Sequence, residues 1–153
     1  MFLIKLIKKF NQNKIPYALV GGHAVAIHGA VRGTMDVDFV LKWTLDTLTL
    51  TEKTLKNMGL MPRLPISATD VFNFKDEYIN NRNLIDWNFY NPTRPSEQVD
   101  IIITHDLTNL KTIKVRYQDV AINVLSKKDL IKMKKHSGRK QDLLDIDALE
   151  KLP

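Results

Sequence analysis

The chain has 153 residues, the usual length of one domain, and 44% of them are hydrophobic, as in a globular rather than a disordered protein. There are 23 Lys and Arg against 17 Asp and Glu, and the net charge of +6 favours an anionic partner such as nucleic acid or a nucleoside phosphate. The sequence has no Cys, which excludes disulfides, Cys-bound zinc and a Cys nucleophile and is compatible with a reducing cytoplasm.

The N-terminal segment MFLIKLIKKF predicts an amphipathic helix. Leu3, Leu6, Ile7 and Phe10 recur at spacings of three and four residues, with Lys residues between them. The apolar run ends at Lys5, so it is too short for a secretory signal or a membrane span. We therefore expect a cytoplasmic protein with no membrane partner.

The next segment predicts a strand, a glycine turn, a short helix and a second strand. Residues 17–20 form a continuous apolar run, typical of a strand buried on both faces, and Gly21-Gly22 ends it. Residues 23–28 are long enough for only a short helix, and residues 35–41 then predict the second strand.

The middle of the chain is less regular. Residues 44–58 have apolar positions at helical spacing and predict a helix, although the Thr-Leu alternation at residues 47–51 also fits a strand. Residues 67–83 are polar and poorly periodic, so we expect a connector with about one helical turn. Residues 84–90 alternate as a half-buried strand, with Ile85, Trp87 and Phe89 on its apolar face.

The last third predicts three strands followed by two helices. We expect a loop at Pro92 and Pro95, and the predicted elements are strands over residues 99–103, 112–117 and 120–125 and helices over residues 127–135 and 139–151. The apolar positions expected in the final helix are Leu143, Leu144, Ile146 and Leu149. Residues 1–153 therefore read as one α+β domain, a mixed β-sheet flanked by helices.

Two carboxylates, those of Asp36 and Asp38, lie in a predicted strand, a type of element in which Asp is disfavoured. If residues 35–41 form a strand, the side chains of Asp36 and Asp38 leave the same face and are neighbours. Like charges so close raise one pKa unless a cation compensates them, and a divalent metal would do so. The alternative is an exposed strand edge with two solvated carboxylates.

Asp100 is the third candidate carboxylate, at the head of the strand predicted over residues 99–103. If this strand pairs beside residues 35–41, the three acids converge, and hard oxygen ligands suit Mg²⁺ or Mn²⁺. Two such ions about 3.5–4 Å apart can clamp the attacking and leaving oxygens of a phosphoryl displacement. Asp86 is a substitute third ligand, and a structural carboxylate is the alternative for Asp100 alone.

Gly21-Gly22 suits phosphate binding because a backbone without Cβ atoms approaches a phosphate closely and the following helix offers free N–H groups. By itself, a Gly-Gly pair between strand and helix more often marks only a tight turn.

Together, Gly21-Gly22, Asp36-Val37-Asp38 and the later Asp100 resemble the nucleotidyltransferase superfamily typified by DNA polymerase β. The run GGHAVAIHGAVRGTMDVDFVL is similar to minimal bacterial nucleotidyltransferases related to the abortive-infection toxins, which carry an Arg-x-Thr-x-Asp-x-Asp element after the glycines. The residues of this chain that match the element and that family's closing signature are Arg32, Thr34, Asp36, Asp38, Lys134, Arg139, Asp142 and Asp145.

This resemblance, which spans about residues 17–149, implies roles for these residues. Asp36, Asp38 and Asp100 would bind metal, and Asp100 would also help activate an acceptor hydroxyl. The nucleotide-binding residues it implies are Gly21, Gly22, Arg32, Thr34, Lys134 and Arg139. Arg32 and Thr34 could instead form hydrogen bonds with the loop backbone and pair with an acidic side chain. The chain departs from the family in having Gly-Gly where many members have Gly-Ser, and in leaving no room for the helical domain of the larger toxins.

The expected function is Mg²⁺- or Mn²⁺-dependent transfer of a nucleoside monophosphate from an NTP such as ATP to a hydroxyl of tRNA (RNA), protein or a small molecule. The toxin resemblance implies an antitoxin partner. Antibiotic modification is the alternative enzymatic function, and a non-catalytic nucleotide- or RNA-binding relative is the alternative class. The basic residues from Lys127 to Lys140 indicate a solvated helix face, and the alternative is a surface that contacts RNA.

Overall fold

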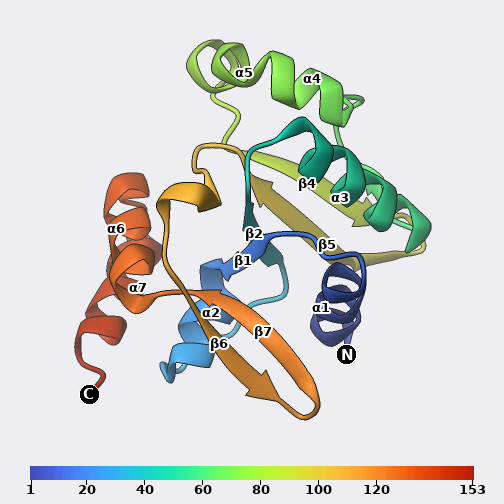
Figure 1. The fold of residues 1–153 in the computed structure, drawn as a ribbon. Helices are drawn as coiled ribbons and strands as arrows, with labels where there is room; N and C mark the ends of the chain where they lie inside the picture. The colour runs from blue at the N-terminus through green and yellow to red at the C-terminus, as the bar shows by residue number, and fades with distance from the viewer.

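A mixed β-sheet forms the centre of the fold in the computed structural model, which describes residues 1–153 (Figure 1). Its strands are β1 (Tyr17–Val20), β2 (Val37–Leu41), β3 (Met61–Pro62), β4 (Asp86–Asn91), β5 (Arg94–Ile102), β6 (Thr112–Tyr117) and β7 (Val120–Leu125). They lie in the order β3-β4-β5-β2-β1-β7-β6. The pairs β1–β7 and β2–β5 are parallel and the other pairs antiparallel, which confirms the predicted α+β class.

Helices cover both faces of this sheet. They are α1 (Phe2–Gln12), α2 (Gly21–His28), α3 (Leu45–Asn57), α4 (Ala68–Asn73), α5 (Lys75–Arg82), the 3₁₀ helix η1 (Leu107–Asn109), α6 (Lys127–Ser137) and α7 (Lys140–Glu150). Helices α1 and α3 contact each other, while α6 packs on α7 and α7 on α2 at the other end of the sheet (Figure 1). No helix has the length and apolar character needed to cross a membrane.

An aromatic cluster fixes α1 on one face of the sheet. The side chains of Phe10, Tyr17 and Phe39 are fully buried, and the ring centroid of Phe10 lies 4.7 Å from that of Phe39 and 5.6 Å from that of Tyr17. Leu6 and Ile7 are buried beside Phe10, as the spacing of α1 predicts. Because strand residues alternate between faces, the neighbours of Phe39 along β2 point to the opposite face of the sheet.

The segment predicted to be a polar connector instead contains two helices, α4 and α5. Ser67 accepts a hydrogen bond from the Asp70 N–H, and the Asp70 carboxylate accepts one from the Ser67 N–H, so a capping box starts α4. Ala68 and Val71 are buried where α4 packs on α3. The prediction was wrong because a helix this short has too few apolar residues to show periodicity.

The starts of strands β2 and β5 also differ from the prediction. Strand β2 begins at Val37, so Asp36 lies in the segment before it rather than on the strand. Strand β5 begins at Arg94 and includes Pro95, because the β4–β5 hairpin closes at Pro92 and Thr93 and its register shifts beside Asn91. A proline is tolerated at such an irregularity, where no ladder hydrogen bond is lost. Asp100 therefore lies in the interior of β5, not at its head.

Several residues predicted to be apolar core are exposed. Ile85 precedes β4 and is 48% exposed, and Leu143 and Leu144 of α7 are 58% and 59% exposed. Helix α7 instead turns Asp142 and Asp145 inward, each only 2% exposed. Buried carboxylates need partners, and these two define the polar network described below.

Candidate active site

The acidic residues meet on one face of three adjacent strands. In the register of β2 with β5, Asp38 stands opposite Asp100, and in the register of β5 with β4, Asp100 stands opposite Asn88. Asp86 precedes Asn88 by two positions and therefore lies on the same face. Phe39 and Trp87 point to the other face and are buried in the core. The strand that carries Asp100 thus pairs beside the strand that carries Asp38, the pairing on which their convergence depends, and the two strands run parallel.

The carboxyl groups of Asp38 and Asp100 lie close enough for each to shift the pKa of the other. Burial, followed by the charge and hydrogen bond of Asp100 and the charges of Asp36 and Asp86, raises the pKa of Asp38 to about 8. Burial and then the Asp100 charge raise the pKa of Asp86 to about 6. None of the four carboxylates forms an ion pair. The acids are therefore gathered here without a direct ion pair, although the charge of Arg139 acts on Asp86 and that of Arg63 acts on Asp100.

Two side chains that were not among the predicted site residues orient Asp100. Asn88 Nδ2 donates to Asp100 Oδ1 over 2.6 Å, and Arg63 Nε donates to Asn88 Oδ1 over 2.9 Å. The guanidinium of Arg63 also lies over the Tyr90 ring, 4.6 Å from its centroid. Asn88 could have been found from the alternation of residues 84–90, which puts it on the same face as Asp86, but nothing in the sequence places Arg63 here.

Only glycine fits at position 21, because the backbone there lies very close to the Asp38 carboxyl. An ideal Cβ built on Gly21 would lie 1.9 Å from Asp38 Oδ2, and Gly21 has a φ of +68°, a conformation that L residues rarely adopt. A Cβ on Gly22 would lie 2.7 Å from Cβ of Thr34. The two glycines therefore let the start of α2 approach the Asp38 carboxyl and the Thr34 segment, and both lie in the first turn of α2 rather than in a separate turn before it.

A small cavity of about 70 Å³ opens beside Gly21. Its lining residues are Val20, Gly21, Asp38, Ile102, Leu130, Met133, Lys134, Ser137, Arg139 and Asp142. The cavity therefore lies between the end of β1, the Asp38 carboxyl and the cationic residues at the junction of α6 and α7.

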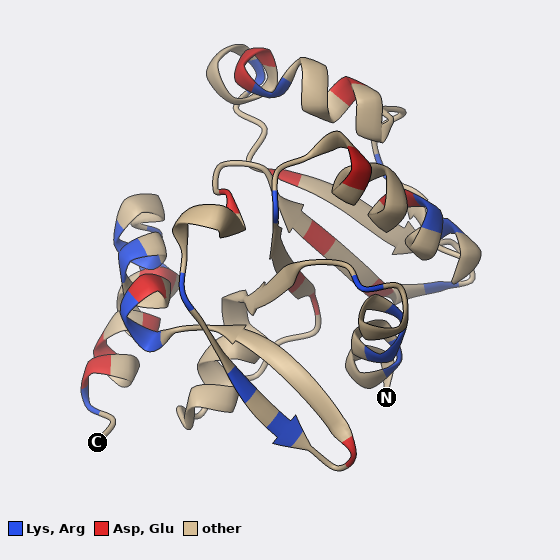
Figure 2. Cartoon of the chain, viewed as in Figure 1, with Lys and Arg blue, Asp and Glu red and all other residues tan.

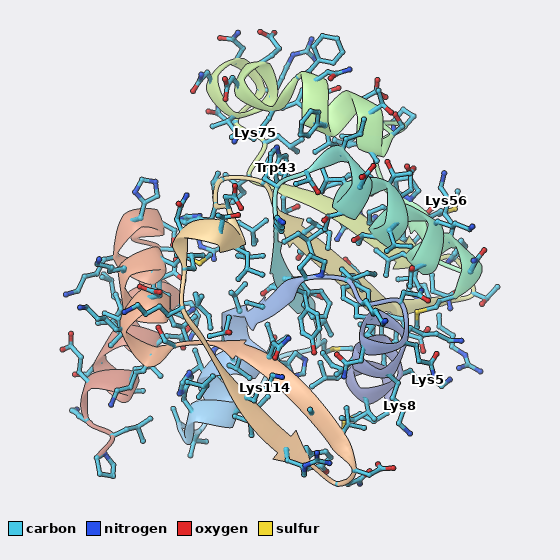
Figure 3. All side chains as sticks on the ribbon, in the orientation of Figure 1. Lys5, Lys8, Trp43, Lys56, Lys75 and Lys114 are labelled. Atoms are coloured by element: carbon cyan, nitrogen blue, oxygen red, sulfur yellow. The ribbon has the colours of Figure 1, made fainter.

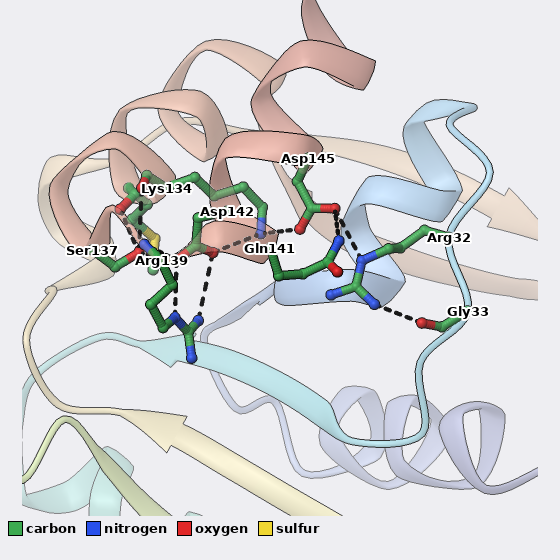
Figure 4. A network of polar contacts seen from close by, with 9 residues as sticks. Arg32, Gly33, Lys134, Ser137, Arg139, Gln141, Asp142 and Asp145 are labelled. Carbon is green, nitrogen blue, oxygen red and sulfur yellow. Dashed lines mark hydrogen bonds and ion pairs between the residues drawn. The ribbon is translucent and has the colours of Figure 1, made fainter.

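A buried ionic network ties α6 and α7 to the segment that precedes β2 (Figure 4). Lys134 Nζ lies 2.9 Å from Asp145 Oδ2 and 3.5 Å from Asp142 Oδ1. On its other oxygen, Asp145 accepts from Arg32 Nε over 3.0 Å. Arg139 Nε donates to Asp142 Oδ2 over 2.9 Å. The cations predicted to bind nucleotide are thus paired with carboxylates of α7.

Lys134 and Arg139 differ in accessibility within this network. Lys134 is 6% exposed, whereas the side chain of Arg139 is 70% exposed and its charge acts on Asp38 and Asp86. Burial opposes ionisation of Asp142, but hydrogen bonds from Arg139 and Ser137 outweigh burial and lower the pKa of Asp142 to about 2. Arg139 can therefore reach an anion at the cavity, while Lys134 chiefly neutralises α7.

The acidic face has the donor chemistry for a divalent cation. Asp38 and Asp100 present hard carboxylate oxygens in contact with each other, an arrangement that a cation would stabilise. Asp36, the third predicted ligand, is exposed before β2, and no three acidic or His side chains converge on one point in this structure. The charge of Asp36 nevertheless acts on both Asp38 and Asp100.

Comparison with known proteins gave matches at the level of structure alone. No family model matches the sequence, and no curated protein matches it. The lincosamide antibiotic adenylyltransferase LnuA, solved with lincomycin bound, superimposes with a TM-score of 0.67 at 15% identity, over 99% of this chain and 96% of LnuA. The antibiotic-resistance factor ANT(2'')-Ia gives a TM-score of 0.66 at 8% identity, over 97% of this chain and 80% of that one.

A third match is an antigenic nucleotidyltransferase-like protein from Paracoccidioides brasiliensis, with a TM-score of 0.58 at 18% identity over 96% of this chain and 73% of that one. Identities this low establish the fold alone. The chain therefore shares the fold of these nucleotidyltransferase structures, as the resemblance carried by the glycine pair and the spaced acids predicted.

Proposed function

We propose that this protein is a Mg²⁺- or Mn²⁺-dependent nucleotidyltransferase that moves a nucleoside monophosphate from an NTP to a hydroxyl acceptor. The observation that carries the proposal is the contact between Asp38 and Asp100, in register on parallel strands, beside the Cβ-free backbone of Gly21. Strand pairing forces these acids together at a cost in charge repulsion, which a purely structural role does not require.

In the proposed reaction the acceptor hydroxyl loses its proton and its oxygen bonds to the α-phosphorus. The bond from that phosphorus to the pyrophosphate oxygen breaks, and pyrophosphate leaves with the electron pair. Asp100 is the proposed proton acceptor, because Asn88 occupies its Oδ1 and holds the carboxylate in one orientation. Arg63 acts through Asn88 as a positioning residue.

Asp36, Asp38 and Asp100 are the residues proposed to hold the metal. A bound divalent ion would neutralise their charge and stabilise negative charge on phosphate oxygens. Asp36 reaches the site from the segment that Arg32 ties to Asp145, so this ion pair positions the third ligand.

The nucleotide phosphates are proposed to lie against Gly21 and Gly22 at the start of α2, where the backbone N–H groups and the helix dipole favour an anion. Arg139, exposed at the same cavity, supplies a guanidinium for the phosphates. Lys134 and Arg32 contribute through the network that holds α7 and the Thr34 segment in place.

The acceptor hydroxyl could belong to tRNA, a protein or a small molecule. The only support for a tRNA or protein acceptor, and for an antitoxin partner, is the resemblance to abortive-infection toxins. A small-molecule acceptor is also supported by the structural similarity to the antibiotic adenylyltransferase LnuA and to the antibiotic-resistance factor ANT(2'')-Ia. We therefore place antibiotic-type modification first among the acceptor classes.

The test uses NTPs labelled separately at the α- and γ-phosphorus. The protein is incubated with each of the four NTPs, Mg²⁺, and total cellular RNA, protein or a panel of hydroxylated small molecules. The α-label should move to one acceptor class while the γ-label leaves in pyrophosphate, and the Asp38→Asn/Asp100→Asn double variant should transfer neither.

A thermal-shift experiment separates an enzyme from a non-catalytic relative. An NTP with Mg²⁺ should raise the unfolding midpoint of the parent protein, and Asp38→Asn should lose this response. Affinity for RNA that survives Asp38→Asn and weakens mainly with salt would identify an RNA-binding module instead. No Mg²⁺-dependent response to any NTP would overturn the proposed function.

A further inference from the structure

Strand β6 forms one edge of the sheet, and its outer side is exposed (Figure 1). It comes last in the strand order and pairs only with β7. A strand paired antiparallel on one side directs alternate N–H and C=O groups outwards, and no loop or turn backbone group bonds to residues 112–117. Every residue of β6 except Val115 is exposed. The edge is therefore open to pairing with another strand.

An apolar groove of about 430 Å³ lies beside this edge. Val115 and Tyr117 point to the core side of the sheet, because the β7 residues opposite them are buried, and both line the groove. Helices α1 and α2 supply the other walls, with Ile4 and Ile27 among their apolar side chains. A strand added beside β6 would place every second side chain over this groove.

The surface around the groove carries positive charge. Lys114 and Arg116 alternate with the apolar residues of β6 and are exposed (Figure 2). Lys5 and Lys8 of α1 line an adjoining hollow of about 300 Å³, which Tyr117 also lines (Figure 3). None of these four cations forms an ion pair, and no acidic residue lines the groove or the hollow. The charge therefore favours an acidic partner.

The same charges argue against a second copy of this chain as the partner. Two β6 strands paired edge to edge would bring Lys114 and Arg116 of one copy close to the same cations of the other, and like charges across strands are destabilising. Nucleic acid would satisfy the cations but not the aliphatic walls of the groove or the unpaired backbone edge. These two features favour an extended peptide.

We propose that the β6 edge binds an extended segment of a partner protein in which acidic and apolar residues alternate. The segment adds a strand to the sheet, with its apolar side chains over the groove beside Val115 and Tyr117 and its carboxylates facing Lys114 and Arg116. Strands β1 and β7 separate β6 from β2, which carries Asp38. This binding therefore does not depend on the nucleotidyl transfer proposed above.

The probe for this surface is a capped, fluorescein-labelled peptide of sequence Glu-Val-Glu-Ile-Glu-Val-Glu. One control peptide has the same composition with the four Glu residues together, and the other has Lys in place of Glu. Anisotropy titrations with the full chain should give at least about fivefold tighter binding of the alternating peptide than of either control, the effect expected of two cross-strand charge pairs.

Two charge variants locate the binding surface. Lys114→Glu/Arg116→Glu should weaken binding of the alternating peptide at least about fivefold. Lys128→Glu/Lys132→Glu makes the same change of charge at exposed residues of α6 and should bind like the parent protein. A thermal melt of each variant checks that it is folded.

Hydrogen exchange of the ¹⁵N-labelled protein tests strand addition itself. In the free protein the β6 amides that do not bond β7 should exchange fast, and the alternating peptide should slow them. An absence of binding, equal affinity for the alternating peptide and its isomer, equal losses in the two charge variants, or unchanged β6 exchange would overturn the inference.

Two further outcomes would assign this surface to another occupant and also overturn the inference. One is displacement of the labelled peptide by polyuridylate at a lower concentration than by the unlabelled peptide, which would indicate nucleic acid. The other is a dimer in sedimentation that slows β6 exchange without peptide, which would indicate a second copy of the chain.

Discussion

At the scale of single residues, the site depends on contacts that only certain side chains allow. Asp38 lies so close to Gly21 that no side chain fits between them, and it stands opposite Asp100 in the register of β2 with β5. The raised pKa values of Asp38 and Asp86 share their largest cause, burial, and the charge of Asp100 raises both further. The predictions at this scale concern steric space and charge.

Gly21→Ala should destabilise the fold and remove the response to NTP. Its Cβ would overlap the Asp38 carboxyl, and its φ of +68° adds backbone strain, so we expect a loss of at least about 2 kcal/mol in urea unfolding. Gly33→Ala is the control, because nothing lies within 4 Å of a Cβ built there. Equal stabilities of the two variants would contradict the close approach of α2 to Asp38.

Asp38→Asn should flatten the dependence of stability on pH. Because the folded-state pKa of Asp38 is about 8 against an ordinary value of 3.8, its stabilising contribution is complete below 3.8 and is lost as the pH rises through 8. Without divalent ions, the unfolding midpoint of the parent protein should therefore fall relative to that of Asp38→Asn between pH 5 and about pH 8.5.

The control for this pH series is Asp76→Asn, which removes an exposed carboxylate and should follow the parent protein at each pH. A parallel decline of Asp38→Asn and the parent would show that Asp38 ionises normally.

At the scale of elements, α7 is held by charge rather than by a continuous apolar stripe. Ile146 and Leu149 are buried, but Leu143 and Leu144 face solvent, and Asp142 and Asp145 occupy inward positions. Lys134 of α6 forms ion pairs with both acids. Because Asp145 also binds Arg32, the packing of α7 determines where the segment carrying Thr34 and Asp36 lies.

Lys134→Met should destabilise the protein by about 3–5 kcal/mol in urea unfolding, because it leaves two carboxylates of α7 buried with less compensation. Lys132→Met is the matched control: Lys132 belongs to the same helix, is exposed and forms no ion pair, so a change within about 0.5 kcal/mol is expected. Similar losses for the two variants would mean that the buried network contributes nothing specific.

At the scale of the whole molecule, the strand order assembles the site from distant parts of the sequence. Strand β1 lies between β2 and β7, and β2 lies between β1 and β5, so Gly21, Asp38 and Asp100 come to adjacent strands. The order also gathers the acidic residues of β2, β5 and β4 on adjacent strands in the centre of the sheet (Figure 2). Arg139, at the junction of α6 and α7, lines the same cavity as Asp38.

The sequence by itself determined the main elements and the fold class. Helix α1 follows from the spacing of its apolar residues, β1 from its continuous apolar run, and β6 and β7 from their β-prone runs. It also singled out Gly21, Asp38 and Asp100, because glycines and acids beside buried strands conflict with local preference. What only the tertiary structure decided is which partner each polar group meets. Asn88 and Arg63 orient Asp100, and Lys134 pairs with Asp145, through contacts set by strand register and helix packing, which act between residues far apart in the chain.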